Sequence, residues 1–230
     1  VRGEQAARQI EAILATTGAE KVNIIGHSHG GPTSRYVASV YPQYVASVTS
    51  VGGVNWGTPV ADLSHGIGQS SGLLRIVMNG AANALGQLLD FLSGGQLPQD
   101  AGAGIFSLTT ADTLRFNALY PEGMPAEYCG EGAELADNGV HYYSWTGNRL
   151  VTHLADIGDY FLLASGQFIR EANDGLVPAC STHLGKVLRD NYRMNHLDEV
   201  DQLLGLHSSR DTDPPVVFRQ QANRLQLLGL

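Results

Sequence analysis

The segment Gly26-His27-Ser28-His29-Gly30 constrains this chain more than any other part of its sequence. It is a Gly-x-Ser-x-Gly motif that stands between a short apolar run, residues 22–25, and a segment with helical spacing from Thr33 onward. A sharp turn from strand to helix lifts a serine hydroxyl clear of the backbone, and this crowded turn favours glycine on both sides. The context predicts a nucleophile elbow with Ser28 as the nucleophile, in preference to a glycine-rich structural turn.

The length and composition of the chain fit one globular domain. It has 230 residues, of which 43% are hydrophobic and 16% charged, and a formal net charge of −8. These values allow one α/β domain with a complete core over residues 1–230 and argue against a disordered chain. The acidic balance argues against a nucleic-acid-binding protein. The chain contains no run of about 20 apolar residues, so we expect no transmembrane segment. Residues 1–4 lead directly into a helical pattern, so we expect no signal peptide there.

Strand-like and helix-like segments alternate around the motif. Helical spacing over residues 4–16 ends at Gly18, and residues 45–51 form an apolar, β-branched run typical of a buried parallel strand. The loop after it, residues 52–59, would lie at the edge where open α/β sheets place their sites. This order predicts an α/β fold with a mostly parallel sheet flanked by helices. Later segments predict a strand over 140–145, a turn at 173–175 that follows a strand, and helices over 197–204 and 214–228.

The alternation stops between residues 60 and about 139, in a segment rich in Gly, Ala, Ser and Leu. We interpret it as a helical insertion, or cap. From Leu74 to Leu92 apolar residues recur at spacings of three and four, which predicts an amphipathic helix with a wide apolar face. Two interpretations stay open: an ordinary helix packed on the core, or a movable lid that covers a site in water and contacts lipid when open.

A serine nucleophile needs an imidazole that accepts its proton and a carboxylate that orients the imidazole. His27 and His29 flank Ser28 but would point away from it on a tight turn, although the backbone N–H of His29 is well placed to stabilise an oxyanion. His196 precedes a predicted helix late in the chain, as the order serine, acid, histidine requires. In order of preference, the candidate bases are His196, His183 and His207.

Asp174 is the preferred acid because it follows Ser28, precedes His196 and stands in a turn that contains glycine. An aspartate in a turn often only caps its own backbone. That interpretation would hold here without Ser28 and His196. The rival carboxylates are those of Asp156, Asp159 and Asp190.

Cys129 and Cys180 are the two cysteines of the chain. Two thiols alone are a poor metal site, so the alternatives are one disulfide or two buried free thiols. A disulfide would close a loop of about 50 residues and contribute on the order of 4 kcal/mol of stability. It would also indicate a location outside the cytosol.

Four stretches of the chain resemble the true lipases of Pseudomonas and Burkholderia, which are secreted triacylglycerol lipases of the α/β-hydrolase fold. The stretches are Val22-Asn23-Ile24-Ile25-Gly26-His27-Ser28-His29-Gly30-Gly31, Asn173-Asp174-Gly175-Leu176-Val177, Asn195-His196-Leu197-Asp198-Glu199-Val200 and Arg219-Gln220-Gln221-Ala222-Asn223-Arg224-Leu225. The resemblance covers essentially the whole chain. It implies a catalytic triad of Ser28, Asp174 and His196.

The same resemblance implies several further features. Cys129 and Cys180 would form the family disulfide, and the lid would fall on about residues 71–94. The protein would be secreted, would act on lipid at an interface, and would need a lipase-specific, membrane-tethered foldase chaperone. The family begins with a strand and a His-Gly loop that donates a second oxyanion N–H. Nothing equivalent precedes Ser28 here, so we expect this chain to lack that N-terminal part, and the expected activity is that of the complete protein.

The resemblance also implies one structural calcium ion, Ca²⁺. Its ligands would be the carboxylates of Asp156 and Asp198 and the backbone carbonyls of Gln202 and Leu206. A hard cation prefers such oxygens. Asp159 lies one turn from Asp156 and is the alternative ligand. Without a metal, Asp198 would be a carboxylate favoured by the N-terminus of the predicted helix.

These observations give a leading hypothesis and two alternatives. The leading hypothesis is hydrolysis of long-chain triacylglycerols at a lipid–water interface through an acyl-enzyme. The first alternative is a soluble carboxylesterase or acyltransferase of the same fold. The second, from a different class, is a catalytically silent binding module.

Overall fold

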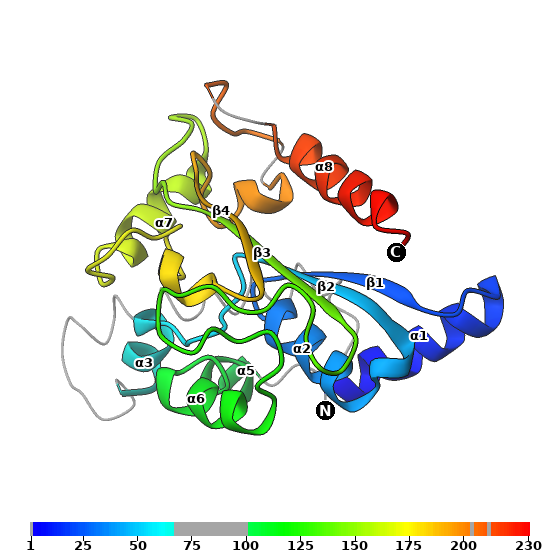
Figure 1. Ribbon diagram of the computed structural model, residues 1–230. Helices are drawn as coiled ribbons and strands as arrows, with labels where there is room; N and C mark the ends of the chain where they lie inside the picture. The colour runs from blue at the N-terminus through cyan, green and yellow to red at the C-terminus, as the bar shows by residue number, and fades with distance from the viewer. Residues whose placement is uncertain (1, 67–100, 203–204, 211–212) are drawn as a thin grey trace.

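The computed structural model describes residues 2–66, 101–202, 205–210 and 213–230 (Figure 1). Within them, one sheet has four strands in the order β1-β2-β3-β4. The strands are β1 (Val22–His27), β2 (Val45–Val51), β3 (His141–Gly147) and β4 (Lys186–Tyr192), and each neighbouring pair is parallel. The carboxyl ends of the strands therefore meet at one edge. The predicted α/β fold with a parallel sheet flanked by helices is confirmed.

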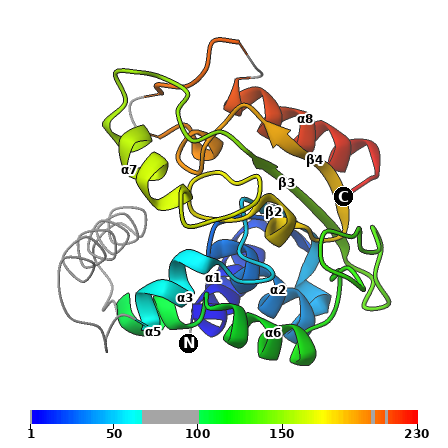
Figure 2. The same cartoon turned by 90° about the vertical axis from the view of Figure 1, so that its left-hand side faces the viewer.

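Helices cover both faces of this sheet. On one face, α1 (Arg2–Thr17) and α2 (Gly30–Val40) pack against the strands, and on the opposite face lies α8 (Pro214–Leu227) (Figures 1 and 2). On the first face, the helices pack against the sheet through an apolar cluster that includes Ala7, Ile10, Val37, Ala38, Val48 and Tyr142. On the second face, α8 packs against the sheet through a cluster of Val51, Trp145, Tyr192, Met194 and Val217. The helical patterns expected over residues 4–16 and 214–228 correspond to α1 and α8.

Two local expectations were wrong, and one strand was not predicted. Residues 168–177 form a loop that follows α7 (Ile157–Gly166), so Asp174 does not come after a strand. The helix expected from residue 197 begins only as the 3₁₀ turn η4 (Asp198–Val200), because Asp201 takes a left-handed conformation with φ of 59°. Residues 203–204 lie outside the described residues. Strand β4 was not predicted, since its polar, half-buried residues lack the apolar pattern of a central strand.

The insertion is helical in its described part. It contains α3 (Pro59–Gly66), α5 (Ala101–Phe106) and α6 (Thr110–Leu119), followed by irregular chain up to β3. Buried Arg35 of α2 fixes α6 by donating to Asn117 Oδ1 at 2.8 Å and to the Tyr120 carbonyl at 2.7 Å. The proposed lid segment, residues 71–94, lies outside the described residues. None of the described helices is long and apolar enough to cross a membrane.

A disulfide joins Cys129 to Cys180, which excludes the alternative of two free thiols. Cys180 belongs to the 3₁₀ turn η3 (Ala179–Thr182), and Cys129 belongs to the irregular chain that precedes β3. The bond therefore attaches the end of the insertion to the loop that carries Asp174. Another 3₁₀ turn, η1 (Pro42–Tyr44), connects α2 to β2.

Candidate active site

Ser28 follows β1 directly and takes a left-handed backbone conformation with φ of 57°. For a residue other than glycine this conformation costs roughly 1–2 kcal/mol. Hydrogen bonds hold it in place, because the Ser28 N–H donates to the Val51 carbonyl at 3.0 Å and the Ser28 carbonyl accepts from Gly31 at 3.0 Å. With β1 before it and α2 two residues after it, Ser28 stands on a sharp strand-to-helix turn, as the motif predicts.

The glycines around Ser28 differ in what they are needed for. A Cβ at Gly26 would run into the carbonyl group of Gly30, and a Cβ at Gly31 would lie 2.7 Å from Ser50 Oγ. A Cβ at Gly30 would meet no described residue within 4 Å. The expectation that both flanks of the motif lack room for a side chain is therefore correct for Gly26 and wrong for Gly30. The second tight position is Gly31, one residue later.

Asp174 and His196 are paired twice. The His196 ring nitrogen Nδ1 lies 2.7 Å from Asp174 Oδ2, and the backbone N–H of His196 donates to the Asp174 carbonyl at 2.9 Å. The other carboxylate oxygen of Asp174 accepts from the N–H groups of Leu176 and Val177 at 2.9 and 2.7 Å. Both side chains are fully buried. Asp174 therefore fixes the position of the His196 ring and leaves its Nε2 for another partner.

The residue before Ser28 connects the elbow to the loop of His196. His27 is the last residue of β1, and its Nε2 lies 2.9 Å from the backbone carbonyl oxygen of His196. Within the described residues, no hydrogen bond joins the Ser28 hydroxyl to the His196 ring. Such bonds are often long in the absence of substrate and tighten only in the reacting complex.

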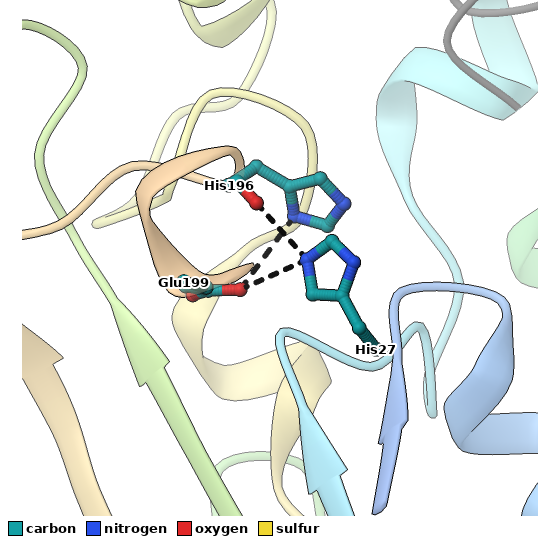
Figure 3. A group of neighbouring side chains, drawn as sticks. All are labelled: His27, His196 and Glu199. Atoms are coloured by element: carbon teal, nitrogen blue, oxygen red, sulfur yellow. Dashed lines mark hydrogen bonds and ion pairs between the residues drawn. The ribbon is translucent and has the colours of Figure 1, made fainter. Parts of the chain in front are cut away.

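Glu199 is a second buried carboxylate at this place, and Figure 3 shows it beside the two histidine rings. Its Oε2 lies 3.4 Å from His27 Nε2 and 3.9 Å from His196 Nδ1. Burial and the neighbouring charge of Asp174 raise the pKa of Glu199 well above its usual value. Burial lowers the pKa of His27 well below its usual value, and the charge on His196 adds to this. Neither residue was predicted at this place from the sequence, where His27 was expected only to point away from Ser28.

His29 begins the turn into α2. Within the described part of the chain its backbone N–H donates no hydrogen bond, so it is available to an oxyanion. Its ring is engaged elsewhere, with Nδ1 3.2 Å from Thr33 Oγ1 and Nε2 2.9 Å from Ser107 Oγ. Burial, assisted by the charge of Arg2, lowers the pKa of His29 to about 4. The ring therefore stays neutral near pH 7.

The two rival histidines have other partners. His183 Nδ1 lies 2.8 Å from the Gly130 carbonyl oxygen, and its Nε2 lies 3.3 Å from Asp190. His207 lies 3.7 Å from both Asp201 and Asp213. Among the described contacts, neither ring touches Ser28 or Asp174.

Three buried carboxylates form a separate cluster. Asp156 caps α7 by accepting from Gly158 N–H at 2.7 Å, and Asp159 accepts from Thr152 and His153 N–H at 2.6 and 2.8 Å. Asp198 accepts from Asn195 N–H at 3.1 Å. One oxygen from each aspartate lies within 4.8 Å of the others. The structure thus brings together Asp156, its alternative Asp159, and Asp198.

Two oxygens in this cluster have no hydrogen-bond donor among the described residues. They are Asp156 Oδ2 and Asp198 Oδ1, both fully buried. Burial raises the pKa of Asp198 to about 6 in this metal-free arrangement, and the charges of Asp159 and Asp156 add to the effect. Unpaired buried carboxylate oxygens are costly unless a cation or a proton neutralises them. Gln202 and Leu206, the other expected ligands, follow η4 on the surface segment after Asp198.

Known proteins are similar in sequence to this chain over its whole length. The triacylglycerol lipase of Vibrio cholerae serotype O1 is 56% identical over 230 residues, which is 100% of this chain and 73% of the relative. The chain belongs to the bacterial triacylglycerol lipase family. A triacylglycerol lipase of Burkholderia plantarii is 38% identical over 262 residues, covering 100% of this chain and 72% of its own length. The profile of the alpha/beta hydrolase fold family matches residues 2–101.

Solved structures agree on the fold. The mature lipase BlEst2 of Bacillus licheniformis superposes with a TM-score of 0.57 at 19% identity, over 85% of this chain and 66% of that one. A metagenomic carboxyl esterase superposes with a TM-score of 0.59 at 20% identity, over 97% and 62%. These two structures confirm the α/β-hydrolase fold, and the triacylglycerol lipases that the chain matches in sequence make it an ester hydrolase, as the resemblance implied.

Proposed function

We propose that the protein hydrolyses long-chain triacylglycerols at a lipid–water interface, with Ser28, His196 and Asp174 as its catalytic triad. The observation that carries this proposal is the buried 2.7 Å contact between Asp174 and His196, in a family member whose Ser28 stands on a strained elbow. Strain of this kind is retained mainly where function requires it.

The reaction follows from these positions. Ser28 Oγ attacks the ester carbonyl carbon while His196 Nε2 accepts the hydroxyl proton, and the charge that develops on the ring is stabilised by Asp174. The N–H of His29 donates to the oxyanion of the tetrahedral intermediate. His196 then returns the proton to the departing glyceryl oxygen, which leaves an acyl-enzyme. A water molecule deprotonated by His196 attacks the carbonyl carbon of that ester, and His196 returns the proton to Ser28 Oγ as the fatty acid leaves.

An exposed apolar row on α7 and the turn before it supports action at a lipid surface. It consists of Ile157, Tyr160 and Leu163 of α7 and of Leu154 in the preceding turn, and Leu154 and Ile157 are 80% and 82% exposed. The opposite face of α7 packs Leu162 against the loop that carries Asp174. An apolar face turned to water is unusual for a short surface helix and is expected where a protein meets lipid or a partner.

We also propose a structural calcium ion in the carboxylate cluster. The residues fit it, because two buried carboxylate oxygens, Asp156 Oδ2 and Asp198 Oδ1, lack donors. The carboxylates of Asp156 and Asp198 and the backbone carbonyls of Gln202 and Leu206 would hold the ion. A bound calcium would neutralise the buried charge. This would fix the loop of His196, since Asp198 stands two residues after the base.

Secretion and a folding partner complete the proposal. The disulfide Cys129–Cys180 supports an oxidising location outside the cytosol. The lipase-specific foldase chaperone and the lid over residues 71–94 rest on the family resemblance. The experiment must distinguish this lipase activity from that of a soluble carboxylesterase or acyltransferase, because all three enzymes would use the same triad.

The test is fatty-acid release by the full-length protein from an emulsified long-chain triglyceride, compared with a soluble short-chain ester. Release that depends on Ser28, and that rises sharply once the substrate forms an emulsion, is the expected result. Cleavage of the soluble ester alone would indicate an esterase. If Ser28→Ala keeps the activity of the parent while remaining folded, the proposed nucleophile is wrong.

A further inference from the structure

The proposed triad leaves one close contact at the site unexplained. His27, the last residue of β1, directs its ring to the loop of His196, and the two ring centroids lie 4.5 Å apart at an interplanar angle of 41°. The polar contact goes to the main chain, where His27 Nε2 lies 2.9 Å from the carbonyl oxygen of His196 (Figure 3). The residue next to the nucleophile is therefore bonded to the residue that carries the base.

The chemistry of this contact fixes its direction. A carbonyl oxygen can only accept, so Nε2 of His27 must carry the hydrogen and donate it. Glu199 Oε2 lies 3.4 Å from the same nitrogen. The lowered pKa of His27 keeps the ring neutral. A neutral ring has one N–H, and here it is directed at the base loop.

Glu199 is itself held rigidly. Its Oε1 accepts from Thr146 Oγ1 at 2.8 Å and from Gly147 N–H at 2.7 Å, both at the carboxyl end of β3. Gly52, directly after β2, leaves room for the carboxylate, since a Cβ at this glycine would run into Glu199. The loop from His196 to Glu199 is thus fastened to β1 by His27 and to β3 by Glu199.

We propose that His27 is a positioning residue, whose Nε2–H holds the backbone carbonyl of His196 and so sets the place of the His196 ring relative to Ser28. This inference rests on the proposed function, because it matters only if His196 is the base. Asp174 fixes the ring's rotation and one end of the loop. His27 adds the tie to β1, the strand that ends at the nucleophile. A shift of about 1 Å between reacting groups can cost 10²-fold in rate.

The test compares two substitutions in the full-length protein. His27→Leu removes the donor and keeps an apolar side chain of similar bulk, whereas His27→Gln keeps an amide N–H that can reach the same carbonyl. We expect kcat on a soluble short-chain ester to fall about 10–100-fold in the leucine variant, with KM within about twofold of the parent. We expect the glutamine variant to recover most of that loss.

His183→Leu is the matched control. His183 is also a buried histidine with a ring nitrogen on a backbone carbonyl, at 2.8 Å from Gly130, and with a carboxylate, Asp190, at 3.3 Å. It does not contact the proposed triad. The His183→Leu variant should have a lower melting temperature and an unchanged kcat, so it separates loss of stability from loss of positioning. If the leucine variant of His27 does not fold, His27→Asn replaces it, because the shorter amide cannot reach the carbonyl.

The outcomes separate this inference from the proposed function. Ser28→Ala measured beside these variants reports on the triad alone. If Ser28→Ala is inactive but His27→Leu keeps its kcat, the positioning role is wrong and the triad stands. If His27→Gln falls as far as His27→Leu, the ring matters for a reason other than the donated hydrogen bond, and the inference is overturned. If Ser28→Ala stays active, the proposed function itself fails.

Discussion

Asp174 and His196 are joined by both their side chains and their backbones. The ring Nδ1 of His196 contacts Asp174 Oδ2 at 2.7 Å, and the His196 N–H donates to the Asp174 carbonyl at 2.9 Å. The backbone bond does not depend on the carboxylate. A substitution of the carboxylate should therefore change the chemistry of the ring more than the fold of the loop.

Asp174→Asn tests this separation. An amide in place of the carboxylate no longer stabilises a charged His196 and can present an N–H to a nitrogen that already carries hydrogen. We expect kcat to fall about 10²–10⁴-fold, with a change in melting temperature of only a few degrees. Steady-state hydrolysis and thermal unfolding measure the two effects. Asp190→Asn, in the His183–Asp190 pair away from the proposed triad, should leave kcat unchanged.

The glycines of the elbow give a second prediction. Gly26→Ala should destabilise the protein by about 1–3 kcal/mol, since its Cβ would overlap the Gly30 carbonyl group. Gly30→Ala should be neutral or stabilising by up to about 1 kcal/mol, because its Cβ meets open space and Gly30 begins α2. Chemical denaturation of the two variants measures the difference. Equal losses in both would contradict the geometry of the turn.

The sequence predicted the elbow and the fold class because both depend on local pattern. An apolar run, a glycine-flanked serine and a helical repeat follow one another within a short segment around Ser28. Residues 45–51 were likewise identified with the bounds that β2 has in the structure. Strand β4 was not predicted because it is polar and only partly buried, so its sequence has no alternation of apolar and polar residues that would indicate a strand paired with β3.

The contacts around the triad could not be predicted from local sequence pattern. His27 was expected to point away from Ser28, and its contact with His196 was not predicted, because it joins residues 169 positions apart. Glu199 fits between β2 and β3 only because Gly52 has no side chain, which is a matter of tertiary packing. The order of Ser28, Asp174 and His196 along the chain gives their roles, whereas the groups that hold them come from strands that meet only in the fold.

The disulfide gives a third prediction. Cys129 and Cys180 are 51 positions apart, and closing a loop of this size stabilises by about 4 kcal/mol in the chain-entropy treatment. Removing it should lower the melting temperature by about 8–16 °C for a domain of this length. Unfolding with and without a reducing agent measures the effect. The double variant Cys129→Ser/Cys180→Ser should match the reduced parent and give no response to the reductant.

Removal of calcium gives a fourth prediction. If the carboxylate cluster holds the ion, adding calcium to chelator-treated protein should raise its melting temperature by about 5–11 °C at a hundredfold excess over the dissociation constant. Asp198→Asn and Asp156→Asn should each abolish the increase. Asp201→Asn, an exposed carboxylate three residues from Asp198, should keep it. Identical unfolding with calcium and with chelator would exclude the proposed site.

The pH dependence of that calcium effect follows from Asp198. Without metal, burial raises its pKa from 3.8 to about 6, so the folded state holds a proton that the unfolded state has already lost between these values. Stability of the metal-free protein should therefore be lost as the pH rises from about 4 through about 6. A bound cation replaces the proton and removes this loss. The difference in melting temperature with and without calcium should be small near pH 4, grow through pH 6 and level off above it. A difference that instead shrinks with rising pH would mean that the ion binds elsewhere.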